Sequence, residues 1–285
     1  MTVAPPHAPR ASVSDLALTV FSRLLEAKTG QRIESYRSWR IDTALTHVLR
    51  ARGFDTLDQL VALVVEGRDR MIGDQIVDAL LNQETSFFRD ASIFDLVVEA
   101  VAAAEQTRRR VRLWCAGCST GQEPLSLAML FAERAEQGAP MPDIIATDVS
   151  DAALTRARAA RYNQFEMQRG LPIRRLMRWF DTDGSDWAGK PELTRLVKFS
   201  RHNLVADPPP AGAFDVILCR NVLLYLSGDA KAGVFRRFAK ALRPDGMLVL
   251  GAGETVIGQT PLFQPGRRFR GFYERAVDGA DSAAA

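Results

Sequence analysis

Apolar residues in the first 81 positions recur at helical spacing and show no alternation typical of strands. Ser14 can cap a first helix that Gly30 ends. Further helices are predicted over residues 37–52, 56–66 and 69–81. The pattern therefore predicts an N-terminal helical domain over residues 13–81. The preceding residues, 1–12, are rich in Pro and Ala, and we expect them to be a disordered tail.

From Val111 onwards, short apolar runs alternate with amphipathic helical segments. Strands are predicted at 111–115, 144–148, 193–199, 214–219, 247–250 and 269–275, with residues 243–246 as a turn. Helices are predicted at 94–106, 125–136, 151–161 and 229–242. This alternation indicates an α/β fold with a doubly wound parallel sheet, over residues 111–277. Residues 82–110 would link it to the helical domain and contribute to the active site, and residues 278–285 would be a second disordered tail.

A loop of small residues follows the first predicted strand, in the run VRLWCAGCSTGQE. Gly117 and Gly121 allow backbone conformations closed to other residues, and Glu123 suits the first turn of the next helix. An ordinary strand-to-helix turn is the alternative interpretation. The spacing is GxxxG, so neither the GxGxxG dinucleotide fingerprint nor the GxxxxGK[ST] phosphate loop is present.

An acidic residue, Asp148, ends the second predicted strand, where it can accept hydrogen bonds from both ribose hydroxyls of an adenosine-containing ligand. The alternative is that it caps the helix from Ser150 onward. Parallel sheets bind ligands at the carboxyl ends of their strands. Six candidate residues fall at such ends: Gly117, Gly121, Asp148, Asn203, Arg220 and Asn221. Without signatures for NAD or ATP, S-adenosylmethionine is the expected ligand.

The segment LNQETSFFRD, residues 81–90, fits neither a clean helix nor a strand. It is either a linker with an aromatic anchor, or a segment that carries Thr85, Ser86 and Arg89 into the pocket while its two phenylalanines pack it down. Methyl transfer to a carboxylate, with a pKa of about 4, needs no general base. The useful groups are then ones that pin the carboxylate, such as the Arg89 guanidinium and the Tyr225 phenol.

Composition excludes several classes of protein. The 285 residues are 47% hydrophobic and 25% charged, which is typical of a soluble globular protein. The net charge of +3 is close to neutral, so we expect no nucleic-acid partner. No apolar run reaches signal-peptide or membrane-span length, so we expect a cytoplasmic location without membrane insertion. Cys115 and Cys118 form a single CxxC and the histidines lack ligand spacing, so no metal is expected. Arginines in and around residues 37–52 form a solvated face or a docking surface for an acidic partner helix.

Five segments together resemble the chemotaxis receptor methyltransferase family, CheR: LNQETSFFRD, LWCAGCSTGQEPLSLAML, IIATDVSDAAL, CRNVLLYL and LRPDGMLVLG. The resemblance covers about residues 14–275. It implies a class I S-adenosylmethionine-dependent methyltransferase sheet, an N-terminal helical domain and a small inserted β subdomain, which would be the irregular stretch 162–198. It also implies methylation of glutamate side chains on the cytoplasmic helical domain of methyl-accepting chemotaxis receptors.

The resemblance assigns site residues as well. Arg89 and Tyr225 would flank the acceptor glutamate as catalytic residues. The cofactor would be held by Gln83, Thr85, Arg89, Gly117, Ser119, Gly121, Glu123, Asp148, Asn203, Leu204, Arg220 and Asn221. Two departures stand out: the family usually has Asn where this chain has Gln83, with Asn82 one place earlier, and GEE where this chain has GQE ending at Glu123.

Two other functions fit the same sheet. A methyltransferase for nucleic acid or a small molecule would carry an Asn/Asp-Pro-Pro-aromatic signature after the fourth strand, where this chain has RNVLLY. A cofactor-binding signalling scaffold would have no need of both Arg89 and Tyr225.

Overall fold

The computed structural model describes residues 14–33, 39–67, 69, 71–107 and 110–276. The chain divides into two compact units, Met1–Leu81 and Asn82–Ala285. Both expected disordered tails, and Arg37 at the predicted start of the second helix, lie outside the described residues.

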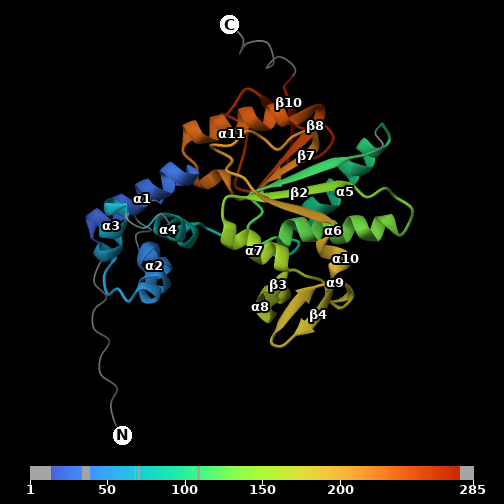
Figure 1. Ribbon diagram of the computed structural model, residues 1–285. Helices are drawn as coiled ribbons and strands as arrows, with labels where there is room; N and C mark the ends of the chain where they lie inside the picture. Colours follow the sequence, from blue (N-terminus) through green and yellow to red (C-terminus); the bar gives the residue numbers. More distant parts are fainter. Residues whose placement is uncertain (1–13, 34–38, 68, 70, 108–109, 277–285) are drawn as a thin grey trace. The chain divides into compact units, whose positions relative to one another are not determined.

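The first unit contains the helices α1 (Asp15–Thr29), α2 (Trp39–Arg52), α3 (Leu57–Glu66) and α4 (Ile72–Leu80) (Figure 1). The predicted caps of α1 are confirmed: the Ser14 hydroxyl accepts a hydrogen bond from the Ala17 N–H at 3.1 Å, and Gly30 ends the helix with a φ of 72°. The side chains that these helices bury include Phe21, Leu25, Ile41, Leu45, Leu60 and Ile76. The apolar residues that recur at helical spacing thus form a hydrophobic core within this unit.

The second unit is built on a sheet in the order β6-β2-β1-β7-β8-β10-β9. Its parallel strands are β1 (Arg112–Ala116), β2 (Asp143–Asp148), β6 (Val197–Arg201), β7 (Phe214–Cys219) and β8 (Leu242–Leu250). Strands β9 (Phe263–Pro265) and β10 (Phe272–Arg275) add an antiparallel edge. The chain runs outward from β1 to β6 and then returns to β7 on the other side of β1. This confirms the doubly wound fold and places the topological switch point between β1 and β7.

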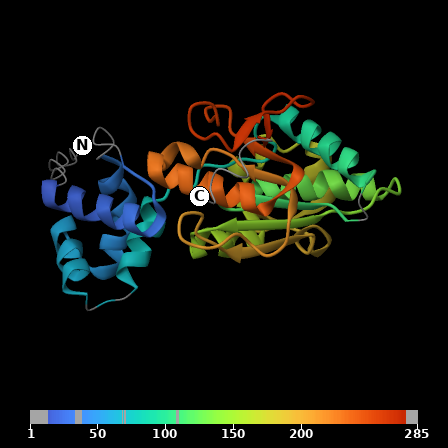
Figure 2. The ribbon, with the colours of Figure 1, turned by 90° about the horizontal axis from the view of Figure 1, so that it is seen from above.

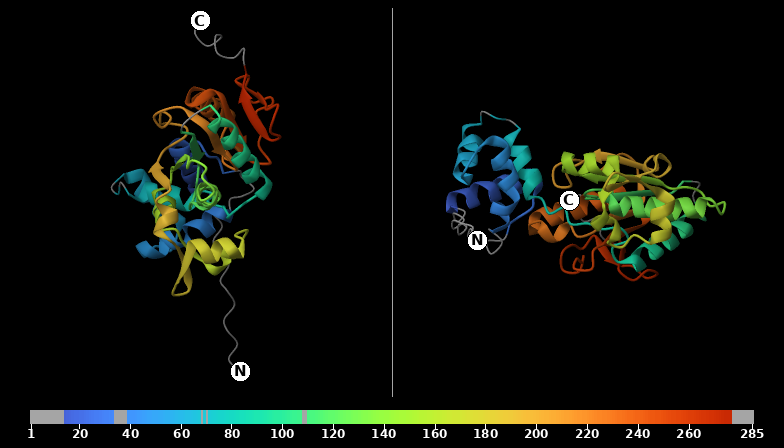
Figure 3. Two further views of the ribbon diagram at one scale, coloured as in Figure 1. Left: turned by 90° about the vertical axis from the view of Figure 1, so that its right-hand side faces the viewer. Right: turned by 90° about the horizontal axis from the view of Figure 1, so that it is seen from below.

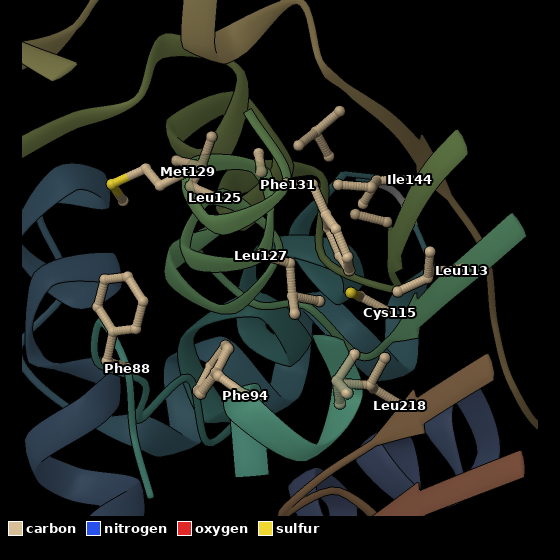
Figure 4. Packing of buried hydrophobic residues seen from close by; sticks show 14 of the residues in the cluster. Phe88, Phe94, Leu113, Cys115, Leu125, Leu127, Met129, Phe131, Ile144 and Leu218 are labelled. Carbon is tan, nitrogen blue, oxygen red and sulfur yellow. The ribbon is translucent and has the colours of Figure 1, made fainter. Parts of the chain in front are cut away.

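Alternating side chains of the strands face two separate cores. Leu113, Cys115 and Leu218 point towards α5 (Ala91–Glu105) and α6 (Gln122–Ala135), where they pack with Phe94, Leu127 and Phe131 (Figure 4). Trp114, Ile217 and Leu248 face the other way, towards Phe235 and Phe238 of α11 (Gly228–Ala241). Figures 1 and 2 show α11 in orange on one face of the sheet and α6 in green on the other. Helix α7 (Asp151–Ala159) packs beside β2 and β6.

An insertion separates α7 from β6. It holds a small antiparallel sheet in the order β3-β5-β4, made of β3 (Arg161–Asn163), β4 (Phe180–Asp183) and β5 (Asp186–Gly189). Three short helices accompany it: α8 (Gln164–Gln168), α9 (Ile173–Trp179) and α10 (Pro191–Thr194). Figure 3 shows this insertion in yellow as a distinct part of the second unit.

Several predicted elements differ from the observed ones. The predicted strand at 193–199 was wrong in its first half, because Pro191 starts a helical turn, α10, and the strand begins only at Val197. The predicted turn at 243–246 lies inside β8, which pairs with β7 across an irregularity in register near Phe214. Helices α5 and α6 each begin three residues before the predicted start.

Candidate functional site

The loop after β1 is tied to the end of β2. The backbone N–H groups of Gly117 and Cys118 both donate to the Thr147 carbonyl, at 2.8 and 2.9 Å. Gly117 has a φ of 82°, and a Cβ built there would lie 2.6 Å from a methyl of Val222. Gly121, with a φ of 95°, caps α6. Both positions therefore require glycine, as the sequence predicted.

Asp148 meets this loop from the carboxyl end of β2. One carboxylate oxygen accepts a hydrogen bond from the Ser119 N–H at 2.8 Å, and the other accepts from the Ser150 N–H at 3.0 Å. The N-cap of α7 is Ser150, whose hydroxyl accepts from the Ala153 N–H at 3.0 Å. Asp148 thus joins the glycine loop to the start of α7 and lies half-buried at the carboxyl end of β2.

Gln83 lies against the same loop. Its side-chain amide donates to the Ser150 hydroxyl at 3.1 Å, and its carbonyl accepts from the Ser119 hydroxyl at 3.0 Å. The neighbouring residue, Asn82, donates from its amide to the hydroxyl of Tyr225. The two adjacent amides thus reach different segments of the second unit.

Phe87 and Phe88 pack the segment 82–90 down, which both interpretations of this stretch expected. The Phe87 ring is fully buried, with edge contacts to Tyr162 and Phe180 at 5.1 and 5.7 Å between centroids. The Phe88 N–H donates to the Ser126 hydroxyl in α6 at 3.1 Å. The following residue, Arg89, is half-buried, and its guanidinium has no ion pair or hydrogen bond with any described residue.

Arg220 follows β7 and joins two other segments. Its guanidinium donates to Glu123 at the start of α6 at 2.8 Å and to Asp90 at 2.5 Å, and its side chain is only 2% exposed. Burial raises the pKa of the Glu123 carboxyl, although the positive charge of Arg220 opposes the shift. Arg89 lies close enough to Glu123 to oppose it further. Since both terminal nitrogens of Arg220 donate to carboxylates, its side chain connects the start of α6 to the segment that ends at Asp90.

Glu254, which follows β8, was not among the predicted site residues. One of its oxygens accepts from the N–H groups of Asn221 and Gly251, both at 2.8 Å. The other accepts from Val222 at 2.9 Å and Leu224 at 3.2 Å. Asn221 has a φ of 60°, which is costly for a residue other than glycine. The carboxylate thereby fixes the 3₁₀ turn Leu223–Tyr225. In the sequence, the one signal for Glu254 is that an acidic residue follows the glycines at the end of a predicted strand.

Asn203 and Leu204 lie just beyond β6. The Asn203 carboxamide oxygen accepts from the Val205 N–H at 3.0 Å, and the Asn203 N–H donates to Asp207 at 2.7 Å. Leu204 packs against the core beneath α11. The structure thus places both residues in a tight turn at the carboxyl end of the sheet, on the side of β2.

Thr85 is half-buried in the same segment as Arg89. The three cysteines are unpaired and buried, and burial raises the pKa of each thiol. Among the described residues, no cluster of His, Cys, Asp and Glu is arranged to hold a metal ion. None of the described helices combines the length and apolar character that crossing a bilayer requires.

Comparison with known proteins identified a matching family model and several related proteins. The family model "CheR methyltransferase, SAM binding domain" matches residues 83–268. A chemotaxis protein methyltransferase of Vibrio anguillarum is 34% identical over 258 residues, covering 89% of this chain and 94% of that protein. Chemotaxis protein methyltransferase 1 of Pseudomonas aeruginosa is 33% identical over 253 residues, covering 86% and 92%. Among solved structures, a TehB-like SAM-dependent methyltransferase from Corynebacterium glutamicum is 18% identical, with a TM-score of 0.35 over 62% of this chain and 84% of that one.

Proposed function

The chain belongs to the CheR methyltransferase family, and we propose that it esterifies glutamate side chains on the cytoplasmic helices of chemoreceptors. Its methyl donor is S-adenosylmethionine, because the matched part of the chain is the SAM-binding domain of that family. It is thus a methyltransferase of chemotaxis. The glutamate acceptor, the receptor as partner and the cytoplasmic location are the proposal.

The chemistry of Asp148 and its loop fits an adenosyl ligand. Asp148 is an acidic residue at the carboxyl end of β2 beside the glycine loop, a position that suits the two ribose hydroxyls. The glycine loop between β1 and α6 lies at the same edge of the sheet, and Gly117 and Gly121 let its backbone approach a ligand closely. We assign cofactor contacts to Asp148, the 117–121 loop, Gln83 and Thr85. Asn203, Leu204 and Asn221 would line the same crevice, with Arg220 acting through Glu123.

The observation that carries the acceptor assignment is that the Arg89 guanidinium forms no ion pair with any residue that the structure describes. Nearby Glu123 is already held by Arg220, which leaves Arg89 without a carboxylate of its own among the described residues. A cation in this situation attracts an incoming carboxylate and can grip it through two parallel hydrogen bonds. A glutamate side chain is the acceptor that this arrangement favours over an amine or a nucleobase.

The reaction asks little of the protein besides orientation. S-adenosylmethionine supplies a methyl group on a positively charged sulfur, which a carboxylate oxygen displaces in line. A glutamate with a pKa of about 4 is already ionised at neutral pH, so no side chain has to remove a proton. Arg89 would hold one acceptor oxygen and thereby aim the other at the methyl carbon. Tyr225, steadied by Asn82, would donate a hydrogen bond to the same carboxylate.

Transfer of labelled methyl from S-adenosylmethionine to membranes containing chemoreceptors tests the proposal. We expect label on a protein of receptor size, released as methanol by mild alkali, because glutamyl methyl esters hydrolyse in base. Label that survives alkali would indicate N-methylation and contradict a glutamate acceptor. Cofactor binding without any transfer to cognate receptors would favour a signalling scaffold.

A further inference from the structure

Arg89 stands between two residues with unusual backbone conformations. Phe88 has a φ of 48° and Asp90 a φ of 58°, both in the left-handed region that disfavours residues with a Cβ. Such a conformation is unfavourable and persists only where its surroundings enforce it. The direction in which Arg89 leaves the chain therefore depends on what holds its two neighbours.

The Asp90 side of this turn is bound by a residue that follows a strand of the seven-stranded sheet. Arg220, which follows β7, donates to the Asp90 carboxylate at 2.5 Å. On the Phe88 side, the N–H group is bound by the Ser126 hydroxyl, which itself donates to the Gln122 carbonyl at 2.7 Å. These bonds restrain the backbone on either side of Arg89, and the Phe88 ring makes further contacts that hold the turn.

The Phe88 ring is held from two sides. Phe94 of α5 packs against it at 5.4 Å between centroids. Arg175, in helix α9 of the insertion, places its guanidinium carbon 4.7 Å from the centre of the same ring. A cation over an aromatic face at this distance is attracted by the negative face of the ring. The insertion therefore contacts the turn that carries Arg89.

Arg175 is itself fixed by a carboxylate of the main domain. Its Nε and Nη2 donate to the two oxygens of Glu133 in α6 at 2.9 and 2.8 Å. This two-point contact sets the plane of the guanidinium as well as its position. The hydrogen bond from Arg175 lowers the pKa of Glu133, so the carboxylate stays charged at neutral pH. Glu133, Arg175 and Phe88 thus form a chain of contacts that ends next to Arg89.

A second residue of the insertion touches the same turn. A Cβ built on Gly170, which has a φ of 89°, would lie 2.1 Å from the carbonyl oxygen of Phe87. The backbone of the insertion therefore lies directly against the residue that precedes Phe88. Two contacts from separate positions, Gly170 and Arg175, meet one turn of the site.

We propose that Arg175 is a positioning residue for methyl transfer, which holds the Phe88 ring and thereby aims Arg89 at the acceptor carboxylate. The inference rests on the proposed function for the role of Arg89. The insertion would then contribute a positioning residue to the methyl-transfer site. Arg175 touches neither donor nor acceptor and acts only through Phe88.

Hydrogen exchange tests the structural half of this proposal without any methyl acceptor. In Arg175→Ala, amides in the peptide covering residues 84–90 should exchange about fivefold faster, because the turn opens more readily. Arg178→Ala is the matched control, since Arg178 lies on the same helix but pairs with Glu136 and stacks on Trp179. Equal exchange in the wild type, Arg175→Ala and Arg178→Ala would overturn the proposal.

Kinetics tests the functional half. Arg175→Ala should lower turnover of the receptor substrate at least about tenfold, as expected for a misplaced catalytic group, while S-adenosylhomocysteine affinity changes less than about twofold. Arg175→Lys keeps the charge but not the two-point contact, and should recover part of the loss. In an Arg89→Ala background, adding Arg175→Ala should change turnover less than about twofold, because the group that it positions is gone.

The outcomes separate the two proposals. If the losses of turnover caused by Arg175→Ala and Arg89→Ala multiplied fully in the double variant, Arg175 would have a general structural role and the inference would be overturned. Base-labile methylation by the wild type would still support the proposed function in that case. If the wild type formed no glutamyl ester, the proposed function would fail, and the exchange experiment would still decide whether Arg175 holds the turn.

Discussion

The side-chain amide of Asn82 donates a hydrogen bond to the hydroxyl of Tyr225, joining two segments 143 residues apart in sequence. Tyr225 ends the short turn after β7, whose backbone is bound by Glu254. Asn82 directly precedes Gln83, which contacts the glycine loop and α7. The pair therefore links Tyr225, which is proposed to contact the acceptor glutamate, to the segment that also reaches the cofactor loop.

Asn82→Ala should lower kcat/KM for the receptor substrate about three- to tenfold, the usual range for losing one hydrogen bond. Cofactor affinity should stay unchanged, because Asn82 faces Tyr225. Tyr225→Phe should have an effect of similar size, and the double variant should lose no more than the larger single one. Steady-state methylation assays check this. Fully multiplicative losses would mean that the two side chains act separately.

Asp148→Ala should weaken binding of S-adenosylhomocysteine by about 1 to 3 kcal/mol, because charge-assisted hydrogen bonds to the ribose would be lost. Titration calorimetry measures the change. Asp151→Ala is a suitable control, since that nearby carboxylate is 72% exposed and pairs with Arg201. An unchanged dissociation constant in Asp148→Ala would remove this residue from the cofactor site.

Arg89→Ala should reduce turnover on the order of a hundredfold while changing cofactor affinity less than about threefold, because its proposed task is to orient the acceptor. Arg89→Lys should restore little, since an ammonium cannot form the two-point contact with a carboxylate. Measuring kcat and S-adenosylhomocysteine binding on the same preparations separates the two effects. Comparable losses in both would place Arg89 on the donor.

Glu254→Gln should destabilise the protein by about 2 to 4 kcal/mol, since a carboxylate that accepts four backbone N–H groups is replaced by an amide with a single acceptor oxygen. Turnover should fall as well, because the turn that carries Tyr225 loses its anchor. Glu274→Gln is the matched control: Glu274 accepts the Arg267 N–H at 3.1 Å and should cost about 0.5 kcal/mol or less. Urea unfolding at neutral pH compares the variants, and equal midpoints would contradict the role given to Glu254.

The Glu133–Arg175 pair should make stability depend on acid pH. The hydrogen bond from Arg175 lowers the pKa of Glu133 in the folded protein below its ordinary value of 4.5. The folded state then binds fewer protons than the unfolded chain, so the stabilisation is present above pH 4.5 and is lost as pH falls through the folded-state pKa. The difference in unfolding free energy between wild type and Arg175→Ala should therefore shrink below about pH 4.5. In a Glu133→Gln background the difference should not vary with pH over this range.

The sequence by itself determined the frame of the molecule. Local periodicity located the helices of the first unit and the buried strands of the sheet, because burial imposes helical or alternating patterns directly on the chain. The glycines at 117 and 121 and the acid at 148 could be assigned to one edge, because the carboxyl ends of parallel strands meet there. The CheR motifs then predicted the family.

Only the tertiary structure decided how the side chains pair. The insertion is built from short strands with few buried residues, such as β4, so it leaves little pattern in the sequence. Its Arg175 meets Glu133 42 residues away, Arg220 meets Asp90 130 residues away, and the carboxylate of Glu254 meets the N–H of Asn221 33 residues away. Asn82 and Gln83 are adjacent amides, and nothing local says which reaches Tyr225 and which reaches Ser150. Such contacts depend on where the folded backbone brings distant groups together, and that information is spread over the whole chain.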